Sequence, residues 1–242
     1  MPFDTLHEYI TALESRGELR RIRAEVSPRL EMTEIADRVV KAGGPALLFE
    51  RPAGYAAPVL MNAFGTMARV AFALGVSDVN EIAAEIEGLL RTRPPTSLGA
   101  RMRTLSRFWR LAHIAPKQVH TGPCKEVIER DNPSLADLPV LTCWPGDGGP
   151  FLTLPIVLTK HPDTGIRNAG MYRMQVYDER TAGMHWHAHK VGAAHYRAWE
   201  RRGEPMPVAV ALGGDPAIIY AATAPLPEEV DEMLFAGFLR HR

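Results

Sequence analysis

Residues 165–195 read GIRNAGMYRMQVYDERTAGMHWHAHKVGAAH. Their pattern predicts, in order, a strand, a polar turn, a second extended run and the start of a helix, at 168–177, 178–183, 184–190 and 191 onward. In an extended run alternate side chains share a face, so His185, His187 and His189 would point the same way. Neutral imidazole is the commonest metal ligand in proteins, and three together indicate a metal or an anionic cofactor.

Three interpretations of this histidine run stay open on the residues alone. The three imidazoles could form a zinc site that activates water, as in a metallohydrolase. A divalent metal could instead bridge the protein and a phosphate-bearing cofactor. In the third interpretation one histidine binds a ligand, while its neighbours hydrogen-bond backbone or line a wet pocket.

The composition is that of an ordinary soluble protein, and 242 residues can form one large domain or two modest ones. Lys plus Arg equal Asp plus Glu at 28 each, so no net field favours nucleic acid or a membrane. Two cysteines are too few for a disulfide framework, which fits a reducing compartment. The N-terminus is polar and acidic, unlike a secretory signal, and no apolar run reaches membrane-spanning length. We therefore expect a cytoplasmic protein without a membrane span or a nucleic-acid partner.

Helical and strand patterns alternate through residues 1–100. The expected helices lie at 4–17, 30–41, 67–74 and 79–90, and the expected strands at 19–26, 45–49 and 59–63. This alternation predicts an N-terminal α/β domain over residues 1–100.

The tract 91–125 is basic and contains no Asp or Glu. A proline pair and Gly99 mark a connection, and 101–118 is predicted to be a basic helical linker. Such a run can bind phosphate, RNA or a protein partner. It is also typical of a solvated connector whose charges meet acids elsewhere, and we favour the connector.

From residue 119 the sequence turns to short strands and turns that are rich in Gly and Pro. An apolar strand at 151–159 should pair with 168–177 as a hairpin through a turn at 163–165. The later elements are expected at 191–201 (helix), 207–212 (strand), 216 onward (short helix) and 227–240 (helix). Residues 119–242 are thus predicted to form a mixed α and β domain round a small barrel.

The final predicted helix carries one acidic residue of interest. Its apolar stripe is formed by Val230, Met233, Leu234, Gly237 and Phe238. Glu232 faces away from that stripe, which is typical of a solvated carboxylate. Phe235 and Ala236 lie on the same far side, so the alternative is a helix that is covered all round. A covered carboxylate needs a partner, and a metal is one candidate.

Two polar residues interrupt the predicted strand at 168–177. Asn is disfavoured in strands, so Asn168 indicates a turn or a contact with a ligand. Arg173, flanked by Tyr172 and Met174, would need a carboxylate or a phosphate if it is buried.

Four short segments together resemble the UbiD-type decarboxylases: LTCWPGD at 141–147, RNAGMYRMQ at 167–175, GMHW at 183–186 and FAG at 235–237. The resemblance runs essentially from end to end of the chain. Members of this family use prenylated FMN to remove, or sometimes add, a carboxylate on aromatic and α,β-unsaturated acids.

The resemblance implies a set of site residues. Asn168, His189 and Glu232 match the positions that hold a divalent metal, usually manganese, against the flavin phosphate. Oxygen ligands with one imidazole suit manganese or magnesium better than zinc. The positions that match cofactor-binding segments of the family are Met171, Tyr172, Arg173, His185, Trp186, His187, Lys190 and Val191. Arg173 also matches the family's link to its catalytic carboxylates, and backbone at 221–224 matches part of a potassium site.

The fold that the resemblance implies is α+β, with an N-terminal α/β domain followed by a flavin-reductase-like split β-barrel in residues 119–242. In the family the acidic proton donor, with a companion acid paired to the arginine, lies some tens of residues beyond the FAG segment. This sequence stops at Arg242. We therefore expect a truncated part of a longer enzyme, or a second chain that supplies the rest, and an isolated chain that is incomplete and inactive.

The resemblance also implies partners. The substrate is expected to be an aryl or acrylic acid, a flavin prenyltransferase is the expected source of the cofactor, and the full-length form is expected to be a homo-oligomer. The alternatives carried forward are a metallohydrolase that uses the histidine cluster, and an RNA-binding or partner-binding module that uses the basic tract 91–125.

Overall fold

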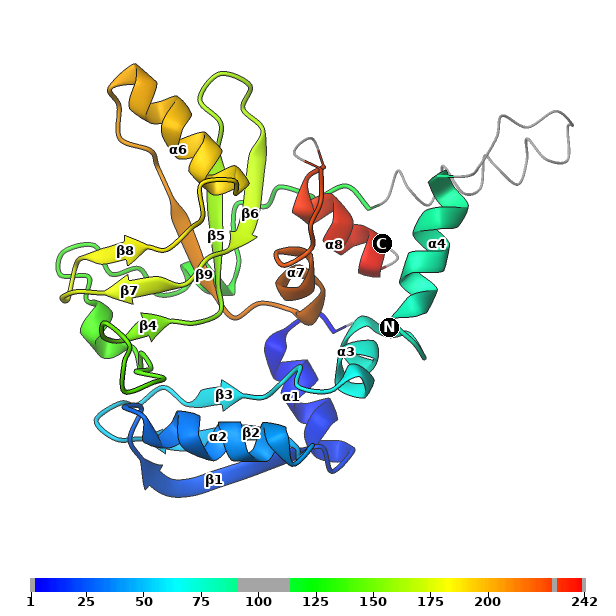
Figure 1. The fold of residues 1–242 in the computed structure, drawn as a ribbon, viewed down its shortest axis with the longest axis vertical. Helices are drawn as coiled ribbons and strands as arrows, with labels where there is room; N and C mark the ends of the chain where they lie inside the picture. The colour runs from blue at the N-terminus through cyan, green and yellow to red at the C-terminus, as the bar shows by residue number, and fades with distance from the viewer. Residues whose placement is uncertain (1–2, 91–113, 228–229, 241–242) are drawn as a thin grey trace, which may run out of the picture.

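The computed structural model describes residues 3–90, 114–227 and 230–240. The predicted linker at 101–118 and the basic tract 91–125 lie mostly outside these residues, so the domain limits stay predictions. The predicted α+β fold class is confirmed, with small sheets and helices packed against them (Figure 1). Within the described ranges, no helix has both the length and the apolar character that crossing a membrane requires.

Residues 3–90 alternate helices and strands as predicted. The elements are α1 (Leu6–Ser15), β1 (Leu19–Val26), α2 (Glu31–Lys41), β2 (Ala46–Pro52), β3 (Val59–Met61), α3 (Met67–Leu74) and α4 (Asn80–Leu90). Strand β2 is central, parallel to β1 and antiparallel to β3. Met32 of α2 packs with Leu47 and Phe49 of β2, which accounts for the apolar spacing of that helix.

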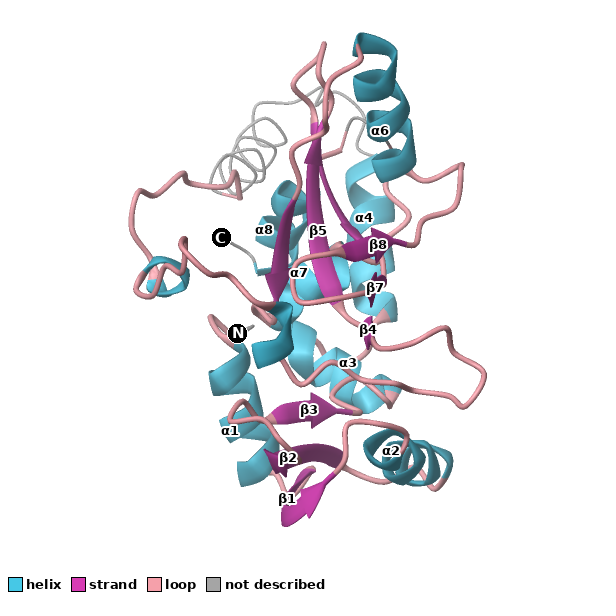
Figure 2. Ribbon diagram, turned by 90° about the vertical axis from the view of Figure 1, so that its left-hand side faces the viewer, coloured by secondary structure: helices cyan, strands magenta, loops and turns pink. Residues whose placement is uncertain are grey.

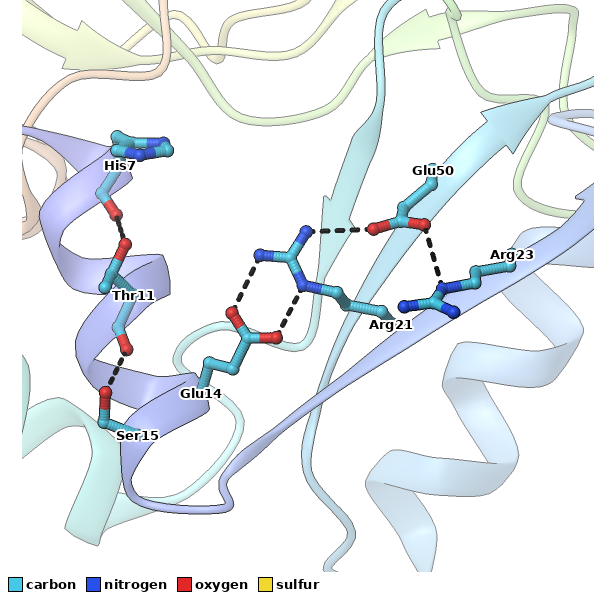
Figure 3. A network of polar contacts seen from close by, with 7 residues as sticks. All are labelled: His7, Thr11, Glu14, Ser15, Arg21, Arg23 and Glu50. Atoms are coloured by element: carbon cyan, nitrogen blue, oxygen red, sulfur yellow. Dashed lines mark hydrogen bonds and ion pairs between the residues drawn. The ribbon is translucent and has the colours of Figure 1, made fainter.

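Arg21 of β1 ties helix α1 to this sheet (Figure 3). Its Nε and Nη2 donate to the two carboxylate oxygens of Glu14 at 2.6 and 2.8 Å, and its Nη1 donates to Glu50 at 2.9 Å. Exposed ion pairs contribute only about 0–1 kcal/mol each. The bidentate geometry nevertheless fixes the direction in which α1 leaves the sheet.

Residues 114–240, apart from the undescribed pair at 228–229, carry nine strands and helices besides two short 3-10 turns at Pro123–Lys125 and Leu135–Asp137. The elements are β4 (Phe151–Leu152), β5 (Pro155–Lys160), β6 (Arg167–Met171), β7 (Met174–Val176), β8 (Ala182–Met184), α6 (Val191–Arg202), β9 (Ala209–Leu212), α7 (Pro216–Ala221) and α8 (Glu232–Arg240). The strands among them form two antiparallel sheets, ordered β4-β7-β8 and β6-β5-β9 (Figure 2).

The predicted hairpin exists, but neither of its strands is continuous. The strand expected at 168–177 breaks into β6 and β7, which belong to different sheets. The break follows from Gly170, because a Cβ there would lie 2.4 Å from the hydroxyl oxygen of Tyr172, which folds back over it. The prediction of one long strand at 168–177 is therefore wrong. The prediction of an extended strand over 184–190 is also wrong, because β8 ends at Met184.

The sheet that contains β5 and β6 is covered on both faces. On one face Ile156 and Ala169 pack with Ile219 and Ala222 of the α7 region, and Met233 of α8 packs against them. On the other face Thr159 forms a hydrogen bond with His195 of α6, with 2.9 Å between Oγ1 and Nδ1. In Figure 1 the β5–β6 hairpin accordingly runs between α6 and the α7–α8 pair.

A segment near residue 142 joins the two parts of the fold. The Leu30 N–H donates to the Thr142 carbonyl at 2.8 Å, and the neighbouring Leu141 is buried in the same cluster as Met32 and Phe49. The glycine-rich loop that follows Thr142 therefore starts from a point fixed on the N-terminal sheet.

Candidate functional site

Strand β6 and helix α8 bring the Glu232 carboxylate to the backbone beside Asn168. A carboxylate oxygen of Glu232 accepts a hydrogen bond from the Ala169 N–H at 2.9 Å, so the side chain lies at the residue next to Asn168. Strand β6 is at the edge of its sheet. Its outward N–H groups at residues 169 and 171 find partners in Glu232 and in the Ala222 carbonyl, at 2.9 and 3.0 Å. The free edge of the strand thus explains why a carboxylate is buried at this point.

Both side chains of this pair are buried, and one has an unmet hydrogen-bonding group. Asn168 is 3% exposed and Glu232 9%. The amide nitrogen of Asn168 has no hydrogen-bond partner among the described residues. A buried donor without a partner costs about 1–3 kcal/mol. A ligand with a phosphate oxygen would satisfy that donor.

The raised pKa of Glu232 fits a site in which a bound cation would lie beside its carboxylate. Burial raises the pKa of this carboxyl, and the hydrogen bond from Ala169 opposes the rise only in part. An ionised Glu232 is therefore unfavourable in the protein alone, and a cation beside it would relieve that cost.

Helix α8 is covered on most sides, which is the alternative that the sequence left open, because Met233 and Phe238 of the predicted stripe also pack against buried clusters. Its buried residues are Glu232, Ala236, Gly237 and Leu239, whereas Val230 and Leu234 of the predicted apolar stripe are 37% and 36% exposed. The prediction that Glu232 faces away from Val230 holds, and the side of the helix that carries Glu232 is buried in the protein. The solvated interpretation of Glu232 is therefore wrong.

The three histidines of the run lie beside one another, although the segment is not a strand. Ring centroids are 6.3 Å apart for His185 and His187, and 5.6 Å apart for His187 and His189, which stack at 14°. Trp186 points the other way, with its ring 5.9 Å from that of Tyr172. Within the described part of the chain no group of three or more His, Cys, Asp or Glu side chains could hold a metal. The metallohydrolase arrangement therefore receives no support.

His189 is exposed on the short loop that leads into helix α6. No hydrogen bond or ion pair joins it to Asn168 or Glu232 within the described residues. Lys190 follows as the N-cap of α6, and its side chain makes no capping bond. The structure thus places Glu232 at the residue next to Asn168. The roles of Asn168, Glu232 and His189 as metal ligands stay predictions.

Arg173 lies in the bend between β6 and β7, where three groups from other segments hold its guanidinium. Its Nε donates to His185 Nδ1 at 2.9 Å, and its Cζ lies 4.4 Å from the ring centroid of Phe151. Its Nη1 is 4.0 Å from a carboxylate oxygen of Asp147. The sequence predicted a carboxylate or phosphate partner only for a buried Arg173; its side chain is 47% exposed, and the acid near it was not identified. Asp147, the one acid in the glycine-rich loop after Thr142, was the available signal.

The remaining predicted cofactor residues form part of the packed wall between β6 and α6, or lie beside it. The Gly192 N–H donates to the Tyr172 hydroxyl at 3.3 Å, and a Cβ on Gly192 would lie 3.1 Å from the Trp186 ring. Met171 turns to the opposite face, against the cluster that contains Ala169. Val191 lines a cavity of about 360 Å³ together with His161, His195 and Arg197. The predicted potassium segment at 221–224 lies at the free edge of β6, where the Ala222 carbonyl accepts the Met171 N–H.

These features define an α+β protein with a buried amide and a buried carboxylate beside the edge of one sheet. Residues 117–242 match the family model UbiD, the 3-octaprenyl-4-hydroxybenzoate carboxy-lyase Rift-related domain. Residues 10–86 match UbiD_N, the N-terminal domain of the same carboxy-lyase. The chain belongs to the UbiD family.

Relatives and solved structures agree with this assignment. An "Uncharacterized protein" of Archaeoglobus fulgidus is 51% identical over 241 residues, which are 99% of this chain and 49% of the relative. Vanillic acid decarboxylase of Sedimentibacter hydroxybenzoicus, in its closed form, is 26% identical with a TM-score of 0.82 over 99% of this chain and 49% of that chain. An evolved dimeric form of the UbiD-class enzyme HmfF from Pelotomaculum thermopropionicum, in complex with prenylated FMN (prFMN), is 29% identical with a TM-score of 0.79 over 98% of this chain and 50% of that one. The chain spans about half the length of these proteins.

Proposed function

We propose that this chain holds the cofactor phosphate in a prenylated-FMN-dependent, non-oxidative decarboxylase of aromatic or α,β-unsaturated carboxylic acids. The same site could run the reverse carboxylation. The observation that carries the proposal is the buried Glu232 carboxylate on the Ala169 amide, next to Asn168, whose buried amide nitrogen has no partner among the described residues. Family membership supports it, as do the vanillic acid decarboxylase and the HmfF complex with prFMN among the structural neighbours.

The proposed metal site consists of Asn168, Glu232 and His189 with Mn²⁺ or Mg²⁺. An amide oxygen and a carboxylate are hard ligands that suit these ions, and phosphate oxygens of the cofactor would complete the shell. The cation offsets the charge of Glu232, whose pKa is raised by burial. A potassium ion near 221–224 is part of the same proposal. His189 would have to turn toward the pair, and its exposed loop position leaves it free to do so.

Prenylated FMN, when bound, supplies the electron sink for the carbon–carbon bond that is broken. Arg173 holds a positive charge at a fixed place beside the site, because Phe151 supports its guanidinium from one face and His185 orients its Nε. We assign to Arg173 the orientation of an acidic partner or of the substrate carboxylate. Met171, Tyr172, Trp186 and Val191 form or flank the wall against which the flavin would lie, and His185, His187 and Lys190 line the loop at its border.

The cellular context is proposed on the same basis. The substrate is an aryl or acrylic acid, the cofactor comes from a flavin prenyltransferase, and the enzyme works in the cytoplasm as a homo-oligomer. The proton donor is assigned to a segment outside this sequence.

The direct test is carbon dioxide release from aryl and acrylic acids by the full-length protein, produced in cells that prenylate FMN and supplied with Mn²⁺. We expect turnover that is lost in Glu232→Gln and retained in Asp163→Asn, which alters an exposed ion pair at the tip of the hairpin. A full-length protein that purifies with prenylated FMN but releases no carbon dioxide from any such acid would contradict the proposal. Full turnover by the 242-residue chain alone would contradict the assignment of the proton donor.

A further inference from the structure

Strand β6 and helix α8 are joined by a second contact, one residue before the Asn168–Glu232 pair on each element. A guanidinium nitrogen of Arg167 lies 2.5 Å from a carboxylate oxygen of Asp231. The next residue of α8, Glu232, accepts the hydrogen bond from the Ala169 N–H at 2.9 Å. The two contacts therefore act on the same strand edge and on the same first turn of α8.

Asp231 uses its two carboxylate oxygens for different purposes. Oδ1 accepts the N–H of Met233 at 2.7 Å, which satisfies one of the free amides at the start of α8. Oδ2 meets Arg167. One side chain thus sets where the helix begins and ties that beginning to β6, and Glu232 is the first residue of the helix.

The ion pair is too exposed to matter much for stability. The side chains of Arg167 and Asp231 are 41% and 33% exposed, and such pairs contribute about 0–1 kcal/mol. Its effect is on geometry. Because the pair holds the residue before Glu232 against β6, it limits the directions that the Glu232 side chain can take.

We propose that Arg167 and Asp231 are positioning residues, which hold Glu232 against Ala169 and so preorganise the cation site. The geometric part of the proposal stands on the contacts themselves. The metal part rests on the proposed function. The tests below separate the two.

The first test needs no metal. It measures the hydrogen-exchange rate of the Ala169 amide in the full-length, metal-free protein. Arg167→Gln removes the ion pair, and Asp231→Asn removes the charge while an amide oxygen can still cap α8. We expect both variants to speed exchange at Ala169 by up to about 5-fold, because local opening of the β6–α8 contact becomes easier. Arg202→Gln is the matched control, since it breaks an exposed ion pair with Asp163 in the turn of the same hairpin and leaves the β6–α8 contact intact. Its exchange at Ala169 should equal that of the wild type.

The second test is Mn²⁺ affinity, measured by electron paramagnetic resonance in the same proteins. Groups that orient metal ligands typically contribute 10–100-fold in affinity, so we expect about 10-fold weaker binding in each single variant. The double variant should be no weaker than either single one, since both remove the same contact. Arg167→Lys, which keeps the charge, should recover part of the loss.

The outcomes distinguish the two claims. Unchanged Ala169 exchange and unchanged Mn²⁺ affinity in Arg167→Gln and Asp231→Asn, with Mn²⁺ lost in Glu232→Gln, would overturn the positioning role and leave the proposed function intact. The other outcome is faster exchange at Ala169 in the two variants, together with Mn²⁺ affinity that Glu232→Gln does not change. That result would support the positioning of Glu232 and contradict the proposed metal site.

Discussion

Arg173 donates a hydrogen bond from Nε to Nδ1 of His185 at 2.9 Å, across the bend that separates β6 from β7. This relationship explains why an arginine occupies a bend between two sheets. Its guanidinium reaches groups from three other segments. The one farthest away in the sequence is Asp147, in a loop that is anchored to the N-terminal part through Thr142. The N-terminal part therefore influences the site through the place of this loop.

We expect Asp147→Asn in the full-length enzyme to lower kcat/KM by about 10-fold, because a small displacement of Arg173 misaligns the group that it orients. The amide can still accept from the Trp144 N–H, so the loop should keep its shape and the thermal midpoint should stay unchanged. Steady-state kinetics beside thermal unfolding checks this. An equal loss in Asp163→Asn, far along the hairpin, would show that the effect is not specific to Arg173.

Gly170→Ala should disrupt the bend between the two sheets. The new Cβ would lie 2.4 Å from the Tyr172 hydroxyl oxygen and 2.5 Å from the ring, and a buried ring has little room to move. Overpacking of this kind costs about 1–3 kcal/mol. Urea unfolding measures the loss, and Gly122→Ala is the control, because no atom lies within 4 Å of its added Cβ. Equal stability of the two variants would refute the packing explanation of the break.

Glu232→Gln should make the metal-free protein more stable at neutral pH. Burial raises the pKa of Glu232 above its ordinary value of 4.5, so the folded state holds the proton more tightly than the unfolded chain does. The free energy of unfolding therefore falls as the pH rises from that ordinary value through the raised one. Glutamine removes this penalty above the raised pKa and changes little below pH 4.5.

Chemical unfolding of both metal-free proteins across this pH range measures the difference. Added Mn²⁺ should reverse the order and favour the wild type, because binding to the folded state stabilises it. A wild type that is the more stable protein without metal at neutral pH would contradict the account of Glu232.

The histidines of the 185–189 run should differ in their effect on metal. We expect His189→Ala to weaken Mn²⁺ binding strongly, whereas His185→Ala and His187→Ala retain it and change flavin binding instead. Metal titration and flavin fluorescence of the three variants separate these effects. Equal loss of metal in all three would favour the metallohydrolase interpretation over the one proposed.

The sequence was sufficient for the local elements of residues 3–90, because apolar spacing there reflects burial against one sheet. Met32, at helical spacing in α2, packs on Leu47 as its pattern predicts. The break after Gly170 could not be predicted from periodicity. It depends on the Tyr172 side chain folding back over a position without a Cβ, which is a tertiary event.

The candidate site was predictable only in part. Periodicity did not decide between a solvated and a covered Glu232, because apolar residues lie on both sides of α8. The strand edge at Ala169 is what buries the side that carries Glu232. Resemblance to the family supplied the pairing of Asn168 with Glu232, which no spacing rule links. The contacts of Arg173 with Asp147 and of Arg167 with Asp231 depend on how loops and helices meet, and only coordinates reveal them.

The most direct measurement is an anomalous difference map at the manganese absorption edge, from crystals of the full-length protein grown with Mn²⁺ and the flavin cofactor. The account predicts one strong peak in contact with Asn168, Glu232 and His189, with the cofactor phosphate on its open side. A peak on His185 and His187, or a bound flavin whose phosphate lies away from Glu232, would contradict it.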